Sequence, residues 1–261
     1  MIELAKDIGL SDELINKLKT LNSTDIQMLC ERCKADFKVL KKQDELTRLA
    51  VCLSYAKRYT LPRYIEKEIS HDIFIDTMSD IKIWYINKGL KNYDWIENHL
   101  NFKLFKIGRL QYQLYKCENK TLNYDFLPFN FGDNLLYVHI PEGEKLIYED
   151  CYYSLREAKR FFTEYFAEFE YRYYFCESWL LYRENQLFMR PDSNIMQFQL
   201  FFDIVYSVPD DKQAIERIFK KRELSKSRYP ENTSLQISAK EFMLRGGKLG
   251  MGIGIIDKAD L

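Results

Sequence analysis

The spacing of hydrophobic positions changes near residue 100. Before it, apolar residues such as Ile26, Cys30 and Phe37 recur every three or four positions, as in helices with one buried face. Beyond it, several segments alternate apolar and polar residues or form short buried runs, as strands do. The pattern predicts an α+β (α/β) chain, with a helical N-terminal domain over residues 1–115 and a mixed-sheet domain over residues 116–261.

Capping residues mark the ends of helices in the first domain. Thr24 and Gln27 fit a capping box, in which the two side chains satisfy free N–H groups at a helix start. Ser70 and Asn92 each stand before an apolar stripe and are favoured N-cap residues. Gly89 follows the stripe after Ser70, and glycine readily adopts the left-handed conformation that ends many helices. We expect helices between these positions.

In the second domain, expected strands and helices alternate. Ser154 and Glu157 form another capping box, which predicts a helix from Ser154 through Tyr165. The other expected elements are strands at 110–114, 135–140, 171–181, 203–207 and 248–256, and helices at 194–201, 210–222 and 234–245. Glycines crowd the last of these strands, which predicts either a close approach to a ligand or another backbone, or a bulge.

Composition narrows the classes of function without naming one. Hydrophobic residues make up 46% and charged residues 30% of the 261 positions, which excludes a mainly disordered chain. Lys and Arg (39) balance Asp and Glu (39), so no overall positive field attracts nucleic acid or an anionic membrane. The start carries early acids, and no run of about 18 apolar residues occurs. We therefore expect a cytoplasmic protein that binds neither nucleic acid nor a membrane.

The cysteines and histidines do not form a familiar metal site. Six cysteines without a secretion signal predict reduced thiols. Cys30 and Cys33 form one C-x-x-C, which suits half of a zinc site or a redox pair, but no second pair completes a tetrahedral set. Both also lie on the apolar face of their helix, which favours burial. Zinc-hydrolase motifs are absent among the three histidines, and no metal is expected.

Four segments of the second half carry a resemblance through their order and spacing. They are Phe105–Gln113 (FKIGRLQYQ), His139–Leu146 (HIPEGEKL), Cys176–Leu181 (CESWLL) and Ser193–Phe202 (SNIMQFQLFF). In these segments the chain resembles a bacterial family of N-acyltransferases that has a helical N-terminal domain and a GNAT-like C-terminal domain. The resemblance implies transfer of an acyl group from acetyl-CoA or another acyl-CoA to the amine of a small molecule or peptide.

The resemblance also implies roles for residues in and near these segments. His139 is the candidate general base, because an imidazole ordinarily titrates at about pH 6.5, and Cys176 or Ser178 would protonate the departing thiolate. The coenzyme is expected at the start of the helix after the buried strand, where free N–H groups and the helix dipole favour phosphate. The residues assigned to the coenzyme are Ile140, Gly143, Ser154, Arg156 and Asn194, and those assigned to the substrate are Arg109, Gln111 and Trp179.

Structural roles compete with each assignment. His139 also suits a core histidine, Cys176 and Ser178 suit packing, and Asn194 suits a helix cap. Arg109 and Gln111 suit solvated polar positions on a half-exposed strand. Glu177 points to the opposite strand face from Cys176 and Ser178, and it receives no role.

Two features depart from the family pattern. The usual phosphate loop, [RQ]-x-x-G-x-[GA], is replaced by a connection with only Gly143 and several carboxylates, among them Glu142, Glu144 and Glu149, which repel phosphate. An extra helical stretch over 210–245 separates the last two expected strands. A non-catalytic GNAT-like module that binds a ligand or a protein, with a homodimer among its forms, is therefore the alternative. The aromatic content of 15% also suits a nucleic-acid module, which the balanced charge disfavours.

Overall fold

The computed structural model describes the whole chain except residues 119, 121, 123, 124 and 126. The described residues form two compact units whose sequences interleave. The first unit comprises Met1–Gln113, Ile140–Gly143 and Phe161–Phe166, and the second comprises Leu114–His139, Glu144–Arg160 and Ala167–Leu261.

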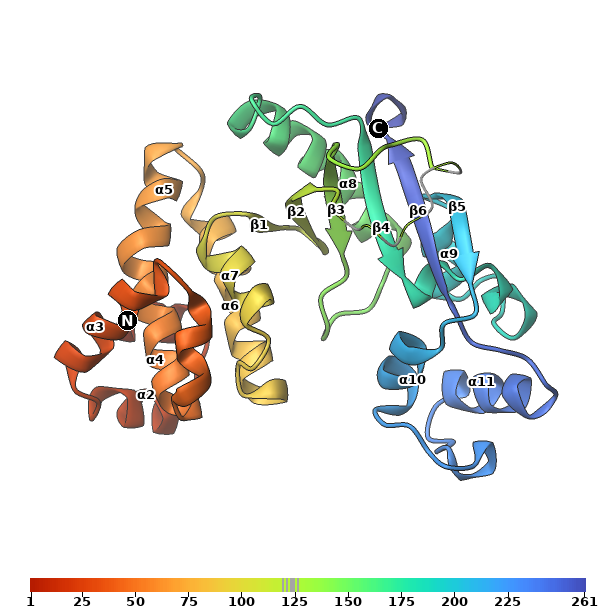
Figure 1. Cartoon of the computed structure of the whole chain (residues 1–261), viewed down its shortest axis with the longest axis horizontal. Coiled ribbons are helices and arrows are strands. Elements are labelled where there is room, and N and C mark those ends of the chain that lie inside the picture. Colours follow the sequence, from red (N-terminus) through yellow and green to blue (C-terminus); the bar gives the residue numbers. More distant parts are fainter. Residues whose placement is uncertain (119, 121, 123–124, 126) are drawn as a thin grey trace. The chain divides into compact units, whose positions relative to one another are not determined.

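Helices build most of the first unit (Figure 1). They are α1 (Ile2–Asp7), α2 (Asp12–Lys19), α3 (Ser23–Cys33), α4 (Glu45–Tyr55), α5 (Leu61–Glu66), α6 (His71–Lys88) and α7 (Tyr93–Leu100). The predicted caps of α6 and α7 are confirmed, because the Ser70 hydroxyl accepts from the Asp72 N–H and the Asn92 side chain accepts from the Trp95 N–H. Gly89 ends α6 with a φ of 56°, as expected for a left-handed helix terminus.

The predicted capping box of α3 is wrong. Asn22 is the N-cap, and its side-chain oxygen accepts hydrogen bonds from the N–H groups of Thr24 and Asp25, at 2.9 and 3.4 Å. The helix begins one residue before Thr24, so Thr24 lies in its first turn. Asn is as good an N-cap as Ser or Asp, and its side-chain oxygen satisfies free N–H groups at this helix start without the box.

Aromatic side chains close the core of the first unit. Tyr64 packs edge-on against Phe102, and Phe102 against Phe105, with ring centroids 4.8 and 4.9 Å apart. Phe105 also contacts Phe161 and Phe166, at 5.2 and 4.9 Å. A short segment from much later in the chain therefore completes the core of the helical unit.

One mixed sheet runs through the described strands in the order β1-β2-β3-β4-β6-β5 (Figure 1). The strands are β1 (Leu104–Ile107), β2 (Leu110–Lys116), β3 (Asn134–His139), β4 (Tyr173–Ser178), β5 (Asp203–Val208) and β6 (Met251–Asp257). β3 and β4 are parallel, whereas β6 is antiparallel to both β4 and β5. The predicted fold class, a helical N-terminal region followed by a mixed sheet with helices, is confirmed.

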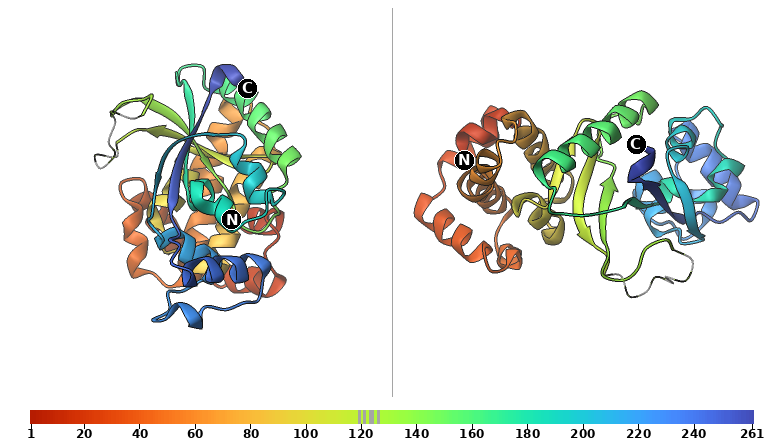
Figure 2. Two further views of the ribbon diagram at one scale, coloured as in Figure 1. Left: turned by 90° about the vertical axis from the view of Figure 1, so that its right-hand side faces the viewer. Right: turned by 90° about the horizontal axis from the view of Figure 1, so that it is seen from above.

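The two faces of the sheet in the second unit carry different side chains. Tyr137 on β3 and Phe175 on β4 pack with the core formed around Phe129 and Ile253 on one face, which we call the tyrosine face. Because strand side chains alternate, Tyr174 and Cys176 point to the other face. Figure 2 shows helix α8 (Tyr148–Tyr165) on one side of the strands.

The helical stretch that separates the last two strands forms α10 (Lys212–Phe219) and α11 (Ser234–Leu244). β5 runs in the same direction as β4, since both are antiparallel to β6. The chain therefore enters this insertion at the end of the sheet where β4 also ends, and Figure 1 shows both helices there. No described helix is long and apolar enough to cross a membrane.

Candidate active site

The site begins where two parallel strands end side by side. β3 and β4 are in register at Leu136 with Tyr174 and at Tyr137 with Phe175. Beyond these pairs the two strands diverge toward their carboxyl ends (Figure 1). Where two parallel strands diverge, their backbone N–H and C=O groups no longer pair with each other. A ligand that lies between the strands can then form hydrogen bonds with these groups.

His139 is the last residue of β3 and lies half-buried at this opening. Its imidazole stacks on the ring of Tyr137, two residues earlier on the same strand face, with centroids 4.1 Å apart and ring planes 24° apart. The stack restricts the rotation of the imidazole about its side-chain bonds. His139 is therefore held on the tyrosine face, at the end of the strand.

Glu177 lies on the tyrosine face of β4, and His139 lies on the same face of β3. Tyr137 pairs with Phe175, and His139 and Glu177 each follow two residues later, where the two strands diverge. Glu177 is half-buried, and burial, followed by the nearby Asp210, raises the pKa of its carboxyl above the usual 4.5. The pKa of the Tyr137 phenol is raised well above its ordinary value, mainly by burial and secondly by the charge of Glu177.

Cys176, Ser178 and Trp179 take other positions. Cys176 is fully buried on the face opposite Glu177, and burial raises the pKa of its thiol far above the usual value. The Ser178 hydroxyl accepts a hydrogen bond from the Leu180 N–H at 3.2 Å, and the Trp179 N–H donates to Gln213 Oε1 at 2.7 Å. The structure thus brings Glu177, not Cys176 or Ser178, to the face of His139, and the predicted roles of Cys176, Ser178 and Trp179 stay predictions.

The connection after β3 has its own supports within the first unit. Arg109 is buried and donates from Nη1 to the carbonyl oxygen of Pro141 at 3.2 Å, and Asn87 Nδ2 donates to Glu142 at 3.1 Å. Gly143 has a φ of 108°, a conformation that other residues rarely adopt. Arg109 therefore holds the segment that was assigned to the coenzyme, and its predicted contact with substrate stays a prediction.

Gln111, also assigned to the substrate, is fully buried in the first unit. It neighbours Asp80, and its amide is among the groups that lower the pKa of that carboxyl. A position this deep, next to a buried carboxylate, gives Gln111 a structural role beside the predicted one.

The capping box predicted at Ser154 is wrong. Helix α8 begins six residues earlier, at Tyr148, and Ser154 is a buried residue in its second turn. The N–H of Ser154 is therefore not one of the free groups of a helix start, which removes the physical reason for placing phosphate there. Arg156 is exposed, and its Nη1 lies 3.4 Å from the Tyr152 hydroxyl.

Asn194 is the first residue of the short helix α9 (Asn194–Gln199). The hydroxyl of Ser193 caps this helix and accepts from the Met196 N–H at 3.4 Å, as the sequence predicts. The predicted contact between Asn194 and the coenzyme stays a prediction.

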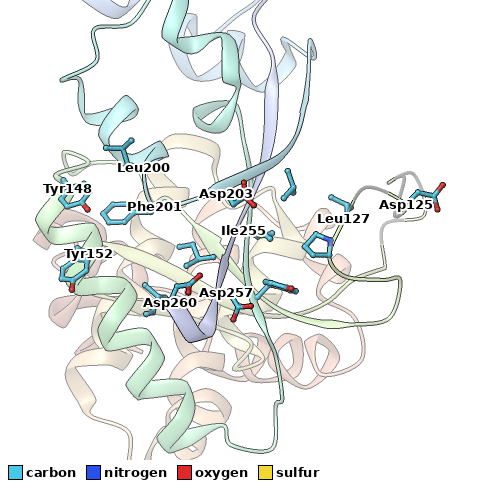
Figure 3. Close-up of a pocket in the computed structure, with 15 residues that line it drawn as sticks. Asp125, Leu127, Tyr148, Tyr152, Leu200, Phe201, Asp203, Ile255, Asp257 and Asp260 are labelled. Atoms are coloured by element: carbon cyan, nitrogen blue, oxygen red, sulfur yellow. The ribbon is translucent and has the colours of Figure 1, made fainter.

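An open pocket of about 770 Å³ lies elsewhere in the second unit (Figure 3). Tyr148 and Phe201 stack on one of its sides, with centroids 4.4 Å apart. Asp257, which forms an ion pair with Arg172 at 2.8 Å, lies on another side. Its lining also includes the carboxylates of Asp125, Asp203 and Asp260 and the apolar residues Leu127, Leu200 and Ile255. These carboxylates disfavour the phosphates of a coenzyme.

Sequence reasoning missed Glu177 and Tyr137 as members of the site. The signal was present, because strand alternation places Glu177 on the same face as Phe175, inside an otherwise apolar and aromatic strand. What the sequence lacked was the pairing of β3 with β4, which puts His139 and Glu177 on the same face of the sheet. In the described part of the chain, no group of three or more His, Cys, Asp and Glu side chains is placed to hold a metal ion.

Sequence profiles of two protein families match the chain. The GNAT-like C-terminal domain matches residues 104–256, and the N-acyltransferase N-terminal domain matches residues 1–101. A search of curated proteins found no significant match.

Solved structures share this fold. One is an acyltransferase in complex with decanoyl-CoA and teicoplanin, which is 20% identical, has a TM-score of 0.77, and aligns over 98% of this chain and 86% of its own. Another is an acyltransferase mutant in complex with octanoyl-CoA, which is 19% identical with a TM-score of 0.75 over the same shares. The strand order, the diverging β3 and β4 and the two profile matches agree, and the chain belongs to the N-acyltransferase family with a helical N-terminal domain and a GNAT-like C-terminal domain.

Proposed function

We propose that this protein transfers a medium- or long-chain acyl group from an acyl-CoA to an amine acceptor, and that His139 is the general base. The observation that carries the proposal is the position of His139. It ends β3 where β3 and β4 diverge, on the face that also carries Glu177 and Tyr137. Structural relatives hold octanoyl-CoA or decanoyl-CoA, and one also holds teicoplanin, which supports a thioester donor longer than acetyl-CoA.

The reaction needs a proton acceptor at the attacking nitrogen. The neutral amine attacks the thioester carbonyl and forms the C–N bond, after which the C–S bond breaks and coenzyme A leaves as a thiolate. His139 removes a proton from the nitrogen as the C–N bond forms, and this proton returns to the thiolate sulfur. A general base of this kind contributes roughly 10²- to 10⁴-fold to the rate.

Thermal unfolding in the presence of candidate donors tests the choice of donor. The ligands are decanoyl-CoA, acetyl-CoA, coenzyme A and ATP, the last as an anion without pantetheine. A ligand at about 100 times its Kd stabilises the folded state by roughly 2.7 kcal/mol, which raises the Tm by several degrees in a chain of this size. We expect decanoyl-CoA to give the largest rise and ATP the smallest.

Either of two outcomes would contradict the proposal. An equal rise with ATP would show an anion site without specificity for a thioester. No rise with any of the four ligands, on protein with a cooperative unfolding transition, would favour the non-catalytic interpretation of the fold.

A further inference from the structure

The carboxylate of Glu177 lacks a positive partner. In the described part of the chain, no lysine or arginine forms an ion pair with it and no side-chain hydrogen bond engages it. The groups that interact with it electrostatically are Asp210, Tyr115, Tyr137 and Cys176, and none of these is a cation. A half-buried carboxylate without a partner is costly to the fold, so its presence calls for a role.

The insertion between β5 and β6 adds a second carboxylate. Asp210 lies two residues before the start of α10, and its side chain accepts a hydrogen bond from the Lys212 N–H at 3.1 Å. The bond from the Trp179 N–H to Gln213 ties α10 to the residue that follows β4. Ser178 pairs with Gly252 and Val208 pairs with Met251, so Glu177 and Asp210 lie at the same end of the sheet. Asp210 accordingly raises the pKa of the Glu177 carboxyl. Two like charges are thus held near the same strand end, where a cation would relieve their repulsion.

Aromatic rings surround the Glu177 side of the sheet. Tyr137 contacts Tyr115 and Phe175 edge-on, with centroids 5.3 and 4.8 Å apart. Aromatic faces attract cations and pack against apolar and aromatic groups. The carboxylates and rings together match a ligand that carries an ammonium group on an apolar or aromatic body.

We propose that Glu177, assisted by Asp210, binds the ammonium group of the acceptor and orients its nitrogen toward His139. This inference rests on the proposed function and adds the chemical class of the acceptor, a primary amine that arrives as a cation with an aromatic or apolar neighbour. Glu177 is in this scheme a substrate-binding residue. The bound ammonium first loses one proton to solvent, and His139 then removes the second proton as the C–N bond forms.

Calorimetric titration with tyramine and its neutral counterpart 4-ethylphenol tests the inference. We expect the wild type to bind tyramine about tenfold more tightly than 4-ethylphenol, because a hydrogen bond between charged groups is worth that factor or more. Glu177→Gln, which keeps the shape of the side chain, should remove this preference. Asp210→Asn should reduce it to a smaller degree.

Asp203→Asn is the matched control. Asp203 is an exposed carboxylate in the pocket of Figure 3, so its loss should leave tyramine binding unchanged. Equal tyramine affinity in the wild type and in Glu177→Gln would overturn the inference. A loss of affinity in Asp203→Asn alone would also overturn it, because the amine would then bind in that pocket.

The decanoyl-CoA measurement separates this inference from the proposed function. Glu177→Gln should show the same rise in Tm with decanoyl-CoA as the wild type, which verifies both its fold and its donor site. A wild type that prefers tyramine through Glu177 but does not respond to decanoyl-CoA would contradict the proposed function alone. A normal response to decanoyl-CoA without any preference for tyramine would contradict the inference alone.

Discussion

Asp80 is a buried carboxylate at the centre of a polar cluster in the helical unit. Its Oδ2 accepts from Trp95 Nε1 at 2.8 Å and lies 3.1 Å from His99 Nε2. The other imidazole nitrogen of His99 lies 2.8 Å from the carbonyl oxygen of Trp95. Burial alone would raise the pKa of Asp80, but the nearby His99, Trp95 and Gln111 outweigh it, and the pKa lies below the usual 3.8.

Replacing Asp80 with Asn should destabilise the protein. The change removes the charge that His99 and Trp95 face, and breaking a buried pair from one side costs about 3 kcal/mol. Urea unfolding of the variant should show this loss in the free energy of unfolding. Asp76→Asn, an exposed position on the same helix, is the control and should change stability little. Equal stability of the two variants would contradict a buried pair.

The same cluster predicts a dependence of stability on pH. Because the folded pKa of Asp80 is lowered, its ionisation stabilises the fold above the unfolded value of 3.8. This contribution is lost as the pH falls through the folded pKa. The stability difference between the wild type and Asp80→Asn should therefore be constant near neutral pH and shrink below about pH 4. A difference that stays constant in acid would show that the charge of Asp80 does not matter.

His139 is the residue whose replacement most directly tests the chemistry. His139→Gln should lower the rate of acyl transfer from decanoyl-CoA to an amine by about 10²-fold or more, because a positioned base is lost. The rate is measured by chromatographic detection of the coenzyme A that the reaction releases. His71→Gln, an exposed histidine of the helical unit, is the control. Unchanged turnover in His139→Gln would remove His139 from the mechanism.

At the level of the elements, the glycines of strand β6 are explained by the chain segments that pack directly against the strand. A side chain at Gly252 would collide with the backbone carbonyl of Leu181, and one at Gly254 would lie 2.7 Å from Cβ of Phe202. Of the two explanations that the sequence allowed, close approach of another backbone therefore applies to Gly252. The chain after β4 can pass over β6 only because no Cβ stands in its way.

Gly252→Ala should therefore destabilise the second unit by about 2 kcal/mol, the usual cost of overpacking, since a backbone carbonyl cannot rotate away. Thermal or urea unfolding measures this cost. Gly247→Ala is the comparison, because its added methyl would meet the ring of Phe242, and a side chain can adjust by rotation where a backbone carbonyl cannot. A larger loss in Gly247→Ala than in Gly252→Ala would contradict this account of the strand.

Sequence periodicity predicted the elements well where their signals are local. The caps at Ser70, Asn92 and Ser193 and the stop at Gly89 depend on neighbouring residues, and the structure confirms them. The start of α8 was missed, because the acidic and aromatic residues from Tyr148 onward are compatible with a loop. The pairing of β3 with β4 depends on residues nearly forty positions apart, so local spacing could not predict that His139 and Glu177 share one face of the sheet.

At the scale of the whole molecule, the interleaved units limit where the chain can be divided. Residues 161–166 supply Phe161 and Phe166 to the ring cluster around Phe105 in the first unit. A fragment that ends directly after the helical region lacks these two rings. The core of the helical unit then faces water where they were.

A fragment of residues 1–115 should therefore fold poorly on its own. Loss of a buried phenylalanine costs about 3–5 kcal/mol, a large part of the stability of a domain of this size. Near-ultraviolet circular dichroism of the fragment should be weak, and its amide NMR spectrum poorly dispersed. A fragment with a cooperative unfolding transition would show that residues 161–166 are dispensable to this core.

The six cysteines are all buried thiols, and this has a practical consequence for measuring the enzyme. Aromatic disulfide reagents react with exposed thiolates, and buried thiols with raised pKa values, such as Cys30 near 11, react slowly. In the native protein such a reagent would report the coenzyme A set free at each turnover against a low background. When the protein unfolds, the same reagent would detect six additional thiols per chain. The same colour change therefore reports both events. Catalysis gives a signal that grows with each turnover, whereas unfolding adds at most six thiols per chain.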